Sequence, residues 1–312
     1  MRYMIDLLLE HLKHSNIIDK GATICKLDKG GSGASLFEIN SVCGDFILKN
    51  YDTVAMQKLG IREYNFYTAS SNLDFKYLPE VIHAEKHKTL GILILLKKYR
   101  DIAIAEWDLP RQLSAADIIA QVHSKSDVFI NKMNMNNEPF IPPATDALEK
   151  AYADWACIMD KHNINKSTFE HITQNFNFIM DFIQAHRDCF IHGDFYPNNC
   201  LLDDNNEMIL VDWQNCELGS MAEVSFFISI GYDWGIDIHE KAIKKHYCER
   251  FSFYTGRTIP IVNLDIECNM STVFVTYLHW AGYLQDSAIG RVKSIYDKMI
   301  TSYRWMLENN CI

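Results

Sequence analysis

Residues 191–199, IHGDFYPNN, decide the fold of this chain. Within nine positions they combine His192, Gly193 and Asp194 with a proline and two asparagines, of which the last is Asn199. Such a stretch is either an ordinary polar loop that contains an aspartate or a loop that performs chemistry. The segment immediately downstream decides between the two.

The residues after Asn199 predict a β-hairpin. Two short apolar segments, 200–202 and 208–211, flank an Asp/Asn-rich turn, which is the usual hairpin pattern, and Asp212 comes directly afterwards. A turn centred between Asn205 and Asn206 would place Asn199 opposite Asp212. Opposed α-carbons in an antiparallel ladder are about 4.5 to 5.5 Å apart, so the two side chains could share one hard cation.

The spacing of these groups indicates phosphoryl transfer. Asp194, four intervening residues, Asn199, a hairpin and Asp212 form the order that kinase-like phosphotransferases use. In that arrangement Asp194 accepts the proton of the acceptor hydroxyl, while Asn199 and Asp212 hold Mg²⁺.

Upstream residues supply the parts that ATP requires. In the segment 28–35, DKGGSGAS, Gly31 and Gly33 would let backbone N–H groups approach phosphates. In FILKN, strand alternation places Ile47 and Lys49 on one face, with Ile47 over the adenine and Lys49 at the phosphates. Glu63, fourteen residues after Lys49, could hold the lysine by an ion pair.

The chain resembles the aminoglycoside phosphotransferase and choline kinase family, which is related to protein kinases. The likeness is carried by KLDKGGSGASLFEI, FILKN, IREYNFY, IIAQVHS, FIHGDFYPNNCLL and ILVDWQNCELG. It implies that Asp194 is the base, that Asn199 and Asp212 bind metal, that Lys49 and Glu63 position phosphate, and that Ser32 lies in the phosphate loop. The adenine is expected near Ile47 and the connection Lys97 to Tyr99.

Departures from protein kinases favour a small acceptor. Gly193 stands where regulated protein kinases carry an arginine, Trp213 and Gln214 replace the Phe-Gly after the metal aspartate, and no A-P-E segment is present downstream. We therefore expect an ATP- and Mg²⁺-dependent kinase that phosphorylates the hydroxyl of a small molecule. A catalytically weak or inactive kinase-like nucleotide-binding protein is the alternative, although Lys49, Asp194, Asn199 and Asp212 are all present.

Composition is consistent with this interpretation. The chain has 312 residues, 48% of them hydrophobic, and a net charge of -10, which argues against nonspecific nucleic-acid binding. Nine cysteines without a C-x-x-C pair suit a reducing compartment, and no apolar run is long enough to span a membrane. We expect a cytoplasmic protein that is a monomer or a homodimer and has no membrane or nucleic-acid partner.

The pattern of elements predicts an α+β, two-lobed, protein-kinase-like fold. Strand-like segments at 24–27, 35–39, 46–51, 81–86 and 89–96, with one helix over 54–70, indicate a small antiparallel-sheet lobe. After residue 100 the periodicity becomes helical. We therefore assign a nucleotide-binding lobe to residues 1–97 and a catalytic and substrate-binding lobe to residues 98–312.

Helical periodicity also predicts several buried side chains. In the helix over 54–70, Ile61 is expected on the same face as Phe66. His123 and His279 lie among apolar residues of helices and are expected in the core. The stripe formed by Phe169, Ile172, Phe176, Ile179 and Phe182 has the spacing of a buried helix face.

The acceptor is expected to be a cation. From Asp188 to Glu240 the chain holds eleven Asp and Glu and neither Lys nor Arg. Carboxylates beside aromatic rings attract ammonium groups, so the substrate-binding candidates are Glu217, Asp233, Trp234 and Asp237. For any one of these carboxylates, solvation or helix capping is an equally good explanation.

A zinc hydrolase that used His192 and Asp194 as metal ligands would need further ligands. The sequence offers none with motif-like spacing.

Overall fold

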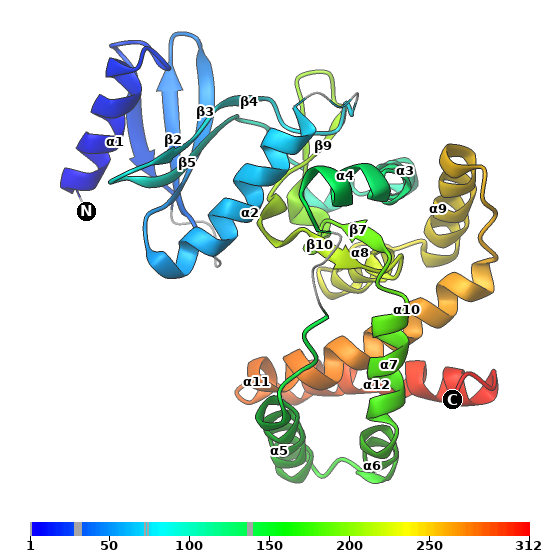
Figure 1. The fold of residues 1–312 in the computed structure, drawn as a ribbon. Helices are drawn as coiled ribbons and strands as arrows, with labels where there is room; N and C mark the ends of the chain where they lie inside the picture. The colour runs from blue at the N-terminus through cyan, green and yellow to red at the C-terminus, as the bar shows by residue number, and fades with distance from the viewer. Residues whose placement is uncertain (1, 28–32, 72, 74, 136–139) are drawn as a thin grey trace.

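The computed structural model describes residues 2–27, 33–71, 73, 75–135 and 140–312. Two groups of elements are visible, a small sheet-rich lobe and a larger helical lobe (Figure 1). This is the two-lobed α+β architecture that the sequence predicts. In the part of the chain that the structure describes, no helix is both long and apolar enough to cross a membrane.

The small lobe is a five-stranded antiparallel sheet with the strand order β1-β2-β3-β5-β4. Its strands match the five predicted segments closely, and two helices accompany them. The elements are α1 (Arg2–His14), β1 (Thr23–Lys26), β2 (Ser35–Ser41), β3 (Gly44–Tyr51), α2 (Val54–Ser70), β4 (Val81–His87) and β5 (Gly91–Lys97). Helix α1 covers one face of the sheet, where Leu8 and Leu12 pack on Phe37, Ile39 and Leu48.

The large lobe is mostly helical, with short strands and turns on either side of the loop 192–199. Its first part contains β6 (Arg100–Asp101), η1 (Ile104–Glu106), α3 (Leu109–Ser124), α4 (Ser126–Lys132), α5 (Thr145–His162), α6 (Ser167–Gln174), α7 (Phe176–Ala185), β7 (Cys189–Ile191), η2 (Pro197–Asn199), β8 (Cys200–Leu202) and β9 (Met208–Leu210). Its second part contains η3 (Trp213–Asn215), β10 (Glu217–Gly219), α8 (Glu223–Asp233), α9 (Glu240–Thr255), α10 (Ile261–Val275), the π-helical turn η4 (Thr276–Trp280), α11 (Ala281–Leu284) and α12 (Ile289–Glu308).

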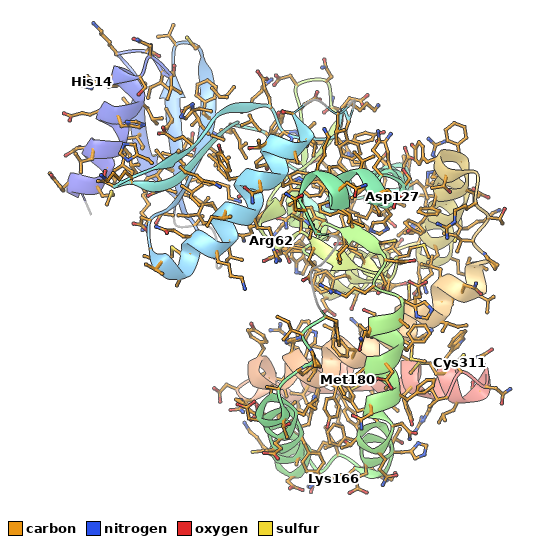
Figure 2. All side chains as sticks on the ribbon, in the orientation of Figure 1. His14, Arg62, Asp127, Lys166, Met180 and Cys311 are labelled. Carbon is orange, nitrogen blue, oxygen red and sulfur yellow. The ribbon has the colours of Figure 1, made fainter. Side chains whose placement is uncertain are left out.

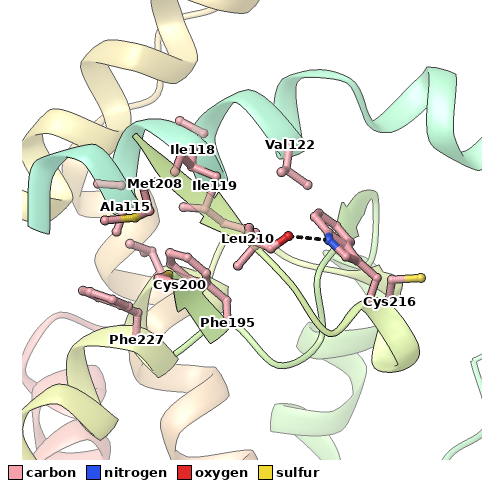
Figure 3. Close-up of a cluster of buried hydrophobic side chains, with 14 of the residues drawn as sticks. Ala115, Ile118, Ile119, Val122, Phe195, Cys200, Met208, Leu210, Cys216 and Phe227 are labelled. Carbon is pink, nitrogen blue, oxygen red and sulfur yellow. Dashed lines mark hydrogen bonds between the residues drawn. The ribbon is translucent and has the colours of Figure 1, made fainter. Parts of the chain in front are cut away.

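The main hydrophobic core crosses from one lobe to the other. Phe66 of α2 in the small lobe stacks on Trp213 of the large lobe, with ring centroids 3.9 Å apart and planes at 11°. Residues of α3, the β8–β9 hairpin and α8 continue this core, as Figure 3 shows for Ile119, Leu210 and Phe227. The packing therefore fixes α2 against the segment that carries Asp212.

A second core lies in a separate group of helices, α5, α6, α7, α10, α11 and α12, which forms the lower part of the molecule in Figures 1 and 2. Trp155 of α5 and Tyr303 of α12 are fully buried in it. The predicted stripe Phe169, Ile172, Phe176, Ile179 and Phe182 packs here as expected, divided between α6 and α7.

Two burial predictions are wrong and one is confirmed. Ile61 is 42% exposed, because it lies about 200° around the helix from Glu63, on the side opposite the buried stripe. His279 is exposed, since it belongs to the π-helical turn η4, whose wider repeat rotates it away from the face that α-helical spacing predicts. His123 is buried, as expected.

Truncation of Phe66 should weaken the joint between the lobes. Phe66→Ala removes a fully buried ring that contacts Phe129 and Trp213, so we expect the free energy of unfolding to fall by about 3 to 5 kcal/mol. Ile61→Ala, on the exposed side of the same helix, should cost far less. Urea unfolding followed by tryptophan fluorescence measures both, and equal losses would contradict this description of the core.

Candidate active site

The loop 192–199 leaves β7 and is held against the turn η3. Gly193 adopts φ 79°, and a Cβ atom on it would lie 2.0 Å from the carbonyl oxygen of Asn215. A side chain at this position would therefore collide with backbone. The glycine that replaces the protein-kinase arginine is thus also required by the close approach of the two segments.

Asp194 belongs to this loop and is half-buried. Its backbone carbonyl accepts a hydrogen bond from Asn199 Nδ2 at 2.8 Å, and its carboxylate oxygen Oδ2 lies 3.5 Å from Asn215 Nδ2. Burial and the neighbouring charge of Asp212 raise the pKa of Asp194 to about 6, while the Asn215 amide opposes the shift. A carboxylate with such a pKa is suited to accept a proton near neutral pH.

The hairpin forms as predicted, but its register differs by one residue. Cys200 pairs with Leu210, so the turn is centred on Asn205 and Asn199 stands opposite Val211 instead of Asp212. The Val211 N–H donates to the Asn199 carbonyl at 2.9 Å. Asp212 lies one residue beyond and adopts φ 70°, a left-handed conformation that turns the chain into η3.

Asn199 and Asp212 offer oxygen atoms that fit Mg²⁺. The Asn199 amide donates through Nδ2 to Asp194, which leaves its oxygen available, and Asp212 keeps one carboxylate oxygen beyond the one that meets Lys49. In the described ranges, no group of three or more His, Cys, Asp or Glu could hold a metal ion. A site with one carboxylate and one amide suits Mg²⁺, which takes its remaining ligands from water and phosphate.

Lys49 reaches the same region from the small lobe. Its side chain is buried, and Nζ lies 2.7 Å from Glu63 Oε2 and 2.6 Å from Asp212 Oδ1. Burial favours the neutral amine, but the charges of Asp212 and Glu63 outweigh it and hold the pKa of Lys49 well above its usual value. The predicted contact between Lys49 and Glu63 is present in the structure, and the lysine remains charged.

Glu63 is the centre of a further network that the sequence did not indicate. Its carboxylate accepts from the Tyr51 hydroxyl and from the Trp213 N–H, the latter at 3.1 Å. The indole of Trp213 donates to the Leu210 carbonyl at 2.9 Å, the bond drawn in Figure 3. Tyr51 follows Lys49 by two residues on β3, and strand alternation places both side chains on one face. The packing of α2 on the sheet then shows that the Tyr51 hydroxyl contacts the Glu63 carboxylate as well.

Glu223 at the start of α8 holds the loop 192–199. Its carboxylate accepts from the His192 N–H at 3.0 Å and from the Gly193 N–H at 2.6 Å. The buried His123 ring lies 3.1 Å from the same carboxylate and 2.7 Å from the Tyr247 hydroxyl. Glu223 therefore has a structural role, because its carboxylate oxygens accept hydrogen bonds from the backbone of the loop.

The remaining nucleotide-binding candidates lie around the edge of the small lobe. Ile47 is partly exposed on β3. Gly33 adopts φ 98°, and a Cβ atom on it would come within contact distance of Leu59 and Gln214. Lys97 at the end of β5 pairs with Asp204 of the hairpin turn at 2.7 Å, and the Tyr99 hydroxyl accepts from the Glu80 N–H. Gly31 and Ser32 lie outside the described residues. The nucleotide contacts of all these residues stay predictions.

The acceptor candidates do not form one acidic cluster. Asp233 pairs with Lys298 of α12 at 2.7 Å, and Glu217 lies 4.0 Å from Arg62 of α2. Asp237 is exposed, and Trp234 packs edge-on against Tyr196, two residues after Asp194, with centroids 5.8 Å apart. Cations from distant segments therefore offset part of the acidic bias seen in the sequence.

A cavity of about 650 Å³ lies elsewhere in the large lobe. It opens between α9, α10 and α12, where Tyr232, Lys244 and Trp305 contribute to its lining. None of the predicted catalytic, metal or acceptor residues lines it. We therefore do not assign it to the acceptor.

Comparison with known proteins identifies the family. A model described as the phosphotransferase enzyme family matches residues 24–234, which is more than half of the chain. The chain therefore belongs to this family, whose members transfer phosphate to hydroxyl groups of small molecules. No curated protein sequence matched the chain.

Solved structures with the same fold include three small-molecule kinases. Spectinomycin phosphotransferase APH(9)-Ia, solved with ADP and spectinomycin, is 15% identical over 94% of this chain and 93% of that chain, with a TM-score of 0.58. Choline kinase from Cryptosporidium parvum Iowa II is 11% identical over 99% and 97%, with a TM-score of 0.60. Macrolide 2'-phosphotransferase MphH from Brachybacterium faecium is 14% identical over 94% and 98%, with a TM-score of 0.56. Identities this low show the fold alone.

Glu223→Gln should loosen the loop 192–199. The amide keeps the size of the side chain, but its NH₂ group faces an N–H donor, so one buried hydrogen bond is lost and the charge-assisted ones weaken. We expect a loss of about 3 kcal/mol in unfolding free energy. Glu149→Gln, on the exposed face of α5, is the control and should change little. Urea unfolding measures both, and an unaffected Glu223 variant would contradict the anchoring role.

Proposed function

We propose that this chain is an ATP- and Mg²⁺-dependent phosphotransferase that phosphorylates a hydroxyl of a small molecule. One observation carries the proposal: Asp194, Asn199, Asp212 and the pair Lys49–Glu63, which come from separate parts of the sequence, converge around one loop. The base, the metal ligands and the phosphate-positioning cation of a kinase site are thus within reach of one another.

Each side chain has a definite task in the proposed reaction. Asp194 accepts the proton of the acceptor hydroxyl while the acceptor oxygen bonds to the γ-phosphorus and the bond to the ADP oxygen breaks. Mg²⁺, when bound, neutralises charge on the phosphates. Asn199 and Asp212 hold the metal, and Lys49, oriented by Glu63, positions phosphate oxygens.

In the proposed function the two lobes bind different substrates. We propose that residues 1–97 bind the nucleotide and that residues 98–312 bind the acceptor and carry the base. The sheet ends at Lys97, and the chain enters the large lobe through Tyr99 and β6, so the adenine would lie beside Ile47 at this connection. The ADP bound to the spectinomycin enzyme supports a nucleotide substrate. A cytoplasmic location and a monomer or homodimer remain part of the proposal.

Substitutions of Asp194 and Asp212 should have different effects, because Asp194 is the proposed base and Asp212 a proposed metal ligand. Asp194→Asn should leave Mg²⁺-ATP binding nearly intact while lowering turnover by roughly 10²- to 10⁴-fold, because the amide cannot accept the proton. Asp212→Ala should weaken nucleotide binding as well, because it removes a metal ligand. Isothermal titration calorimetry and ADP release measure the two effects.

Asp181→Asn, an exposed aspartate of α7, serves as the control for both variants and should behave as wild type. Near-normal turnover of Asp194→Asn would remove this residue from the mechanism. Unchanged Mg²⁺-ATP affinity in Asp212→Ala would equally remove the metal assignment.

We further propose that the acceptor is a cation. The ion pairs of Asp233 and Glu217 reduce their contribution, so the proposal now depends chiefly on the exposed Asp237 and on the aromatic surface of Trp234 beside Tyr196. Spectinomycin and choline name the acceptors of two proteins with this fold, and a cationic acceptor is in keeping with them.

A panel of hydroxylated amines, antibiotics and neutral sugars tests the charge of the acceptor. We expect amines to be preferred, with a KM that rises with salt as the attraction is screened. Asp237→Asn should raise the KM of the best amine by several-fold, and Asp181→Asn should not. Preference for a neutral sugar, with no dependence on salt, would contradict the proposal without affecting the phosphotransferase assignment.

A further inference from the structure

Asn215 is a polar residue of the site that no motif had singled out. It ends the turn η3, three residues after Asp212, and its Nδ2 atom lies 3.5 Å from Asp194 Oδ2. The distance is at the long end for a hydrogen bond. The contact joins the proposed base directly to the segment that carries the metal ligand.

The neighbours of Asn215 are fixed in place. Trp213 is fully buried, with both of its N–H groups hydrogen-bonded, and Gln214 is buried with its side-chain oxygen 3.2 Å from the Tyr51 hydroxyl. The turn therefore has little freedom to move. The amide of Asn215 is presented to Asp194 by a rigid support.

The backbone of Asn215 is fixed from the other side as well. Its carbonyl oxygen packs against Gly193 so closely that the position admits no Cβ atom. Gly193 itself is held by Glu223 and directly precedes Asp194. The distance between the Asn215 amide and the Asp194 carboxylate is thus set from both ends by buried hydrogen bonds.

We infer that Asn215 is a positioning residue for the base: its amide holds Oδ2 of Asp194, so that the other carboxylate oxygen faces the acceptor hydroxyl. This inference rests on the proposed function and adds a residue to it. Because Asn215 and Asp212 share one rigid turn, the same contact aligns the base with the metal ligand. A carboxylate held in this way spends little of the reaction cycle in unproductive orientations.

Asn215→Asp tests the inference because it keeps the shape and replaces the donor with a second acceptor. Asn205→Asp is a matched control, since Asn205 Nδ2 lies 3.4 Å from Asp203 Oδ2 in the exposed hairpin turn and the change in charge is the same. The first readout is the rate of ADP formation from Mg²⁺-ATP with water as the acceptor. We expect Asn215→Asp to lower kcat by about 10- to 100-fold while the KM for ATP changes less than about threefold.

A second variant and a structural readout make the test independent of turnover. In crystal structures of Asn215→Ala and Asn215→Asp, the Asp194 carboxylate should leave its wild-type orientation, whereas in Asn205→Asp it should not. An unchanged Asp194 orientation, or an unchanged kcat, would overturn the inference. Wild-type protein that forms no ADP with any acceptor of the panel would instead contradict the proposed function, and the crystal structures would still decide the role of Asn215.

Discussion

The buried carboxylate of Glu63 is the constraint on which the rest of the site depends. It is completely shielded from solvent, and an unpaired charge in such a place would be very unfavourable. The fold satisfies it with Lys49 from β3, the Tyr51 hydroxyl and the backbone of Trp213 in the large lobe. Because these partners come from both lobes, the lobes can approach only in an arrangement that also brings Lys49 to Asp212.

Glu223 is a second buried carboxylate whose charge is satisfied by partners, and it holds the loop 192–199. Its carboxylate is bonded to two consecutive backbone N–H groups and contacts the buried His123 ring, which in turn meets Tyr247. One buried acid thus holds Lys49 beside Asp212, and another holds the loop that carries Asp194. Asp194 and Asp212 themselves remain partly accessible, as their proposed contacts with substrate and metal require.

Long-range ion pairs change what the local acidity of the sequence suggests. The region around the loop has no Lys or Arg of its own, yet Lys298, Arg62 and Lys97 reach Asp233, Glu217 and Asp204 from other elements. The potential of a surface depends on all charges near it in space, not on those near it in the chain. The negative potential of this region is therefore weaker than a count of carboxylates along residues 188–240 indicates.

The sequence alone determined the family, the two-lobed fold and the set of candidate residues, because these depend on local patterns. The glycines, the strand alternation and the spacing from Asp194 to Asn199 can all be read from residues that are close together in the chain. The helix over 54–70 and the β8–β9 hairpin were predictable for the same reason. Ile61 lies opposite the buried stripe of its helix, and at His279 the π-helical turn interrupts the α-helical repeat.

Tertiary structure alone decided the hairpin register, the contacts of Glu63 with Tyr51 and Trp213, the partners of Glu223, and the contact of Asn215 with Asp194. A one-residue shift in register changes little in a hydrophobic pattern of three residues per strand, so the sequence could not fix it. The contacts join residues separated by 12 to 150 positions. They are selected by the requirement that each buried charge find a partner, and only the packed chain shows which partner that is.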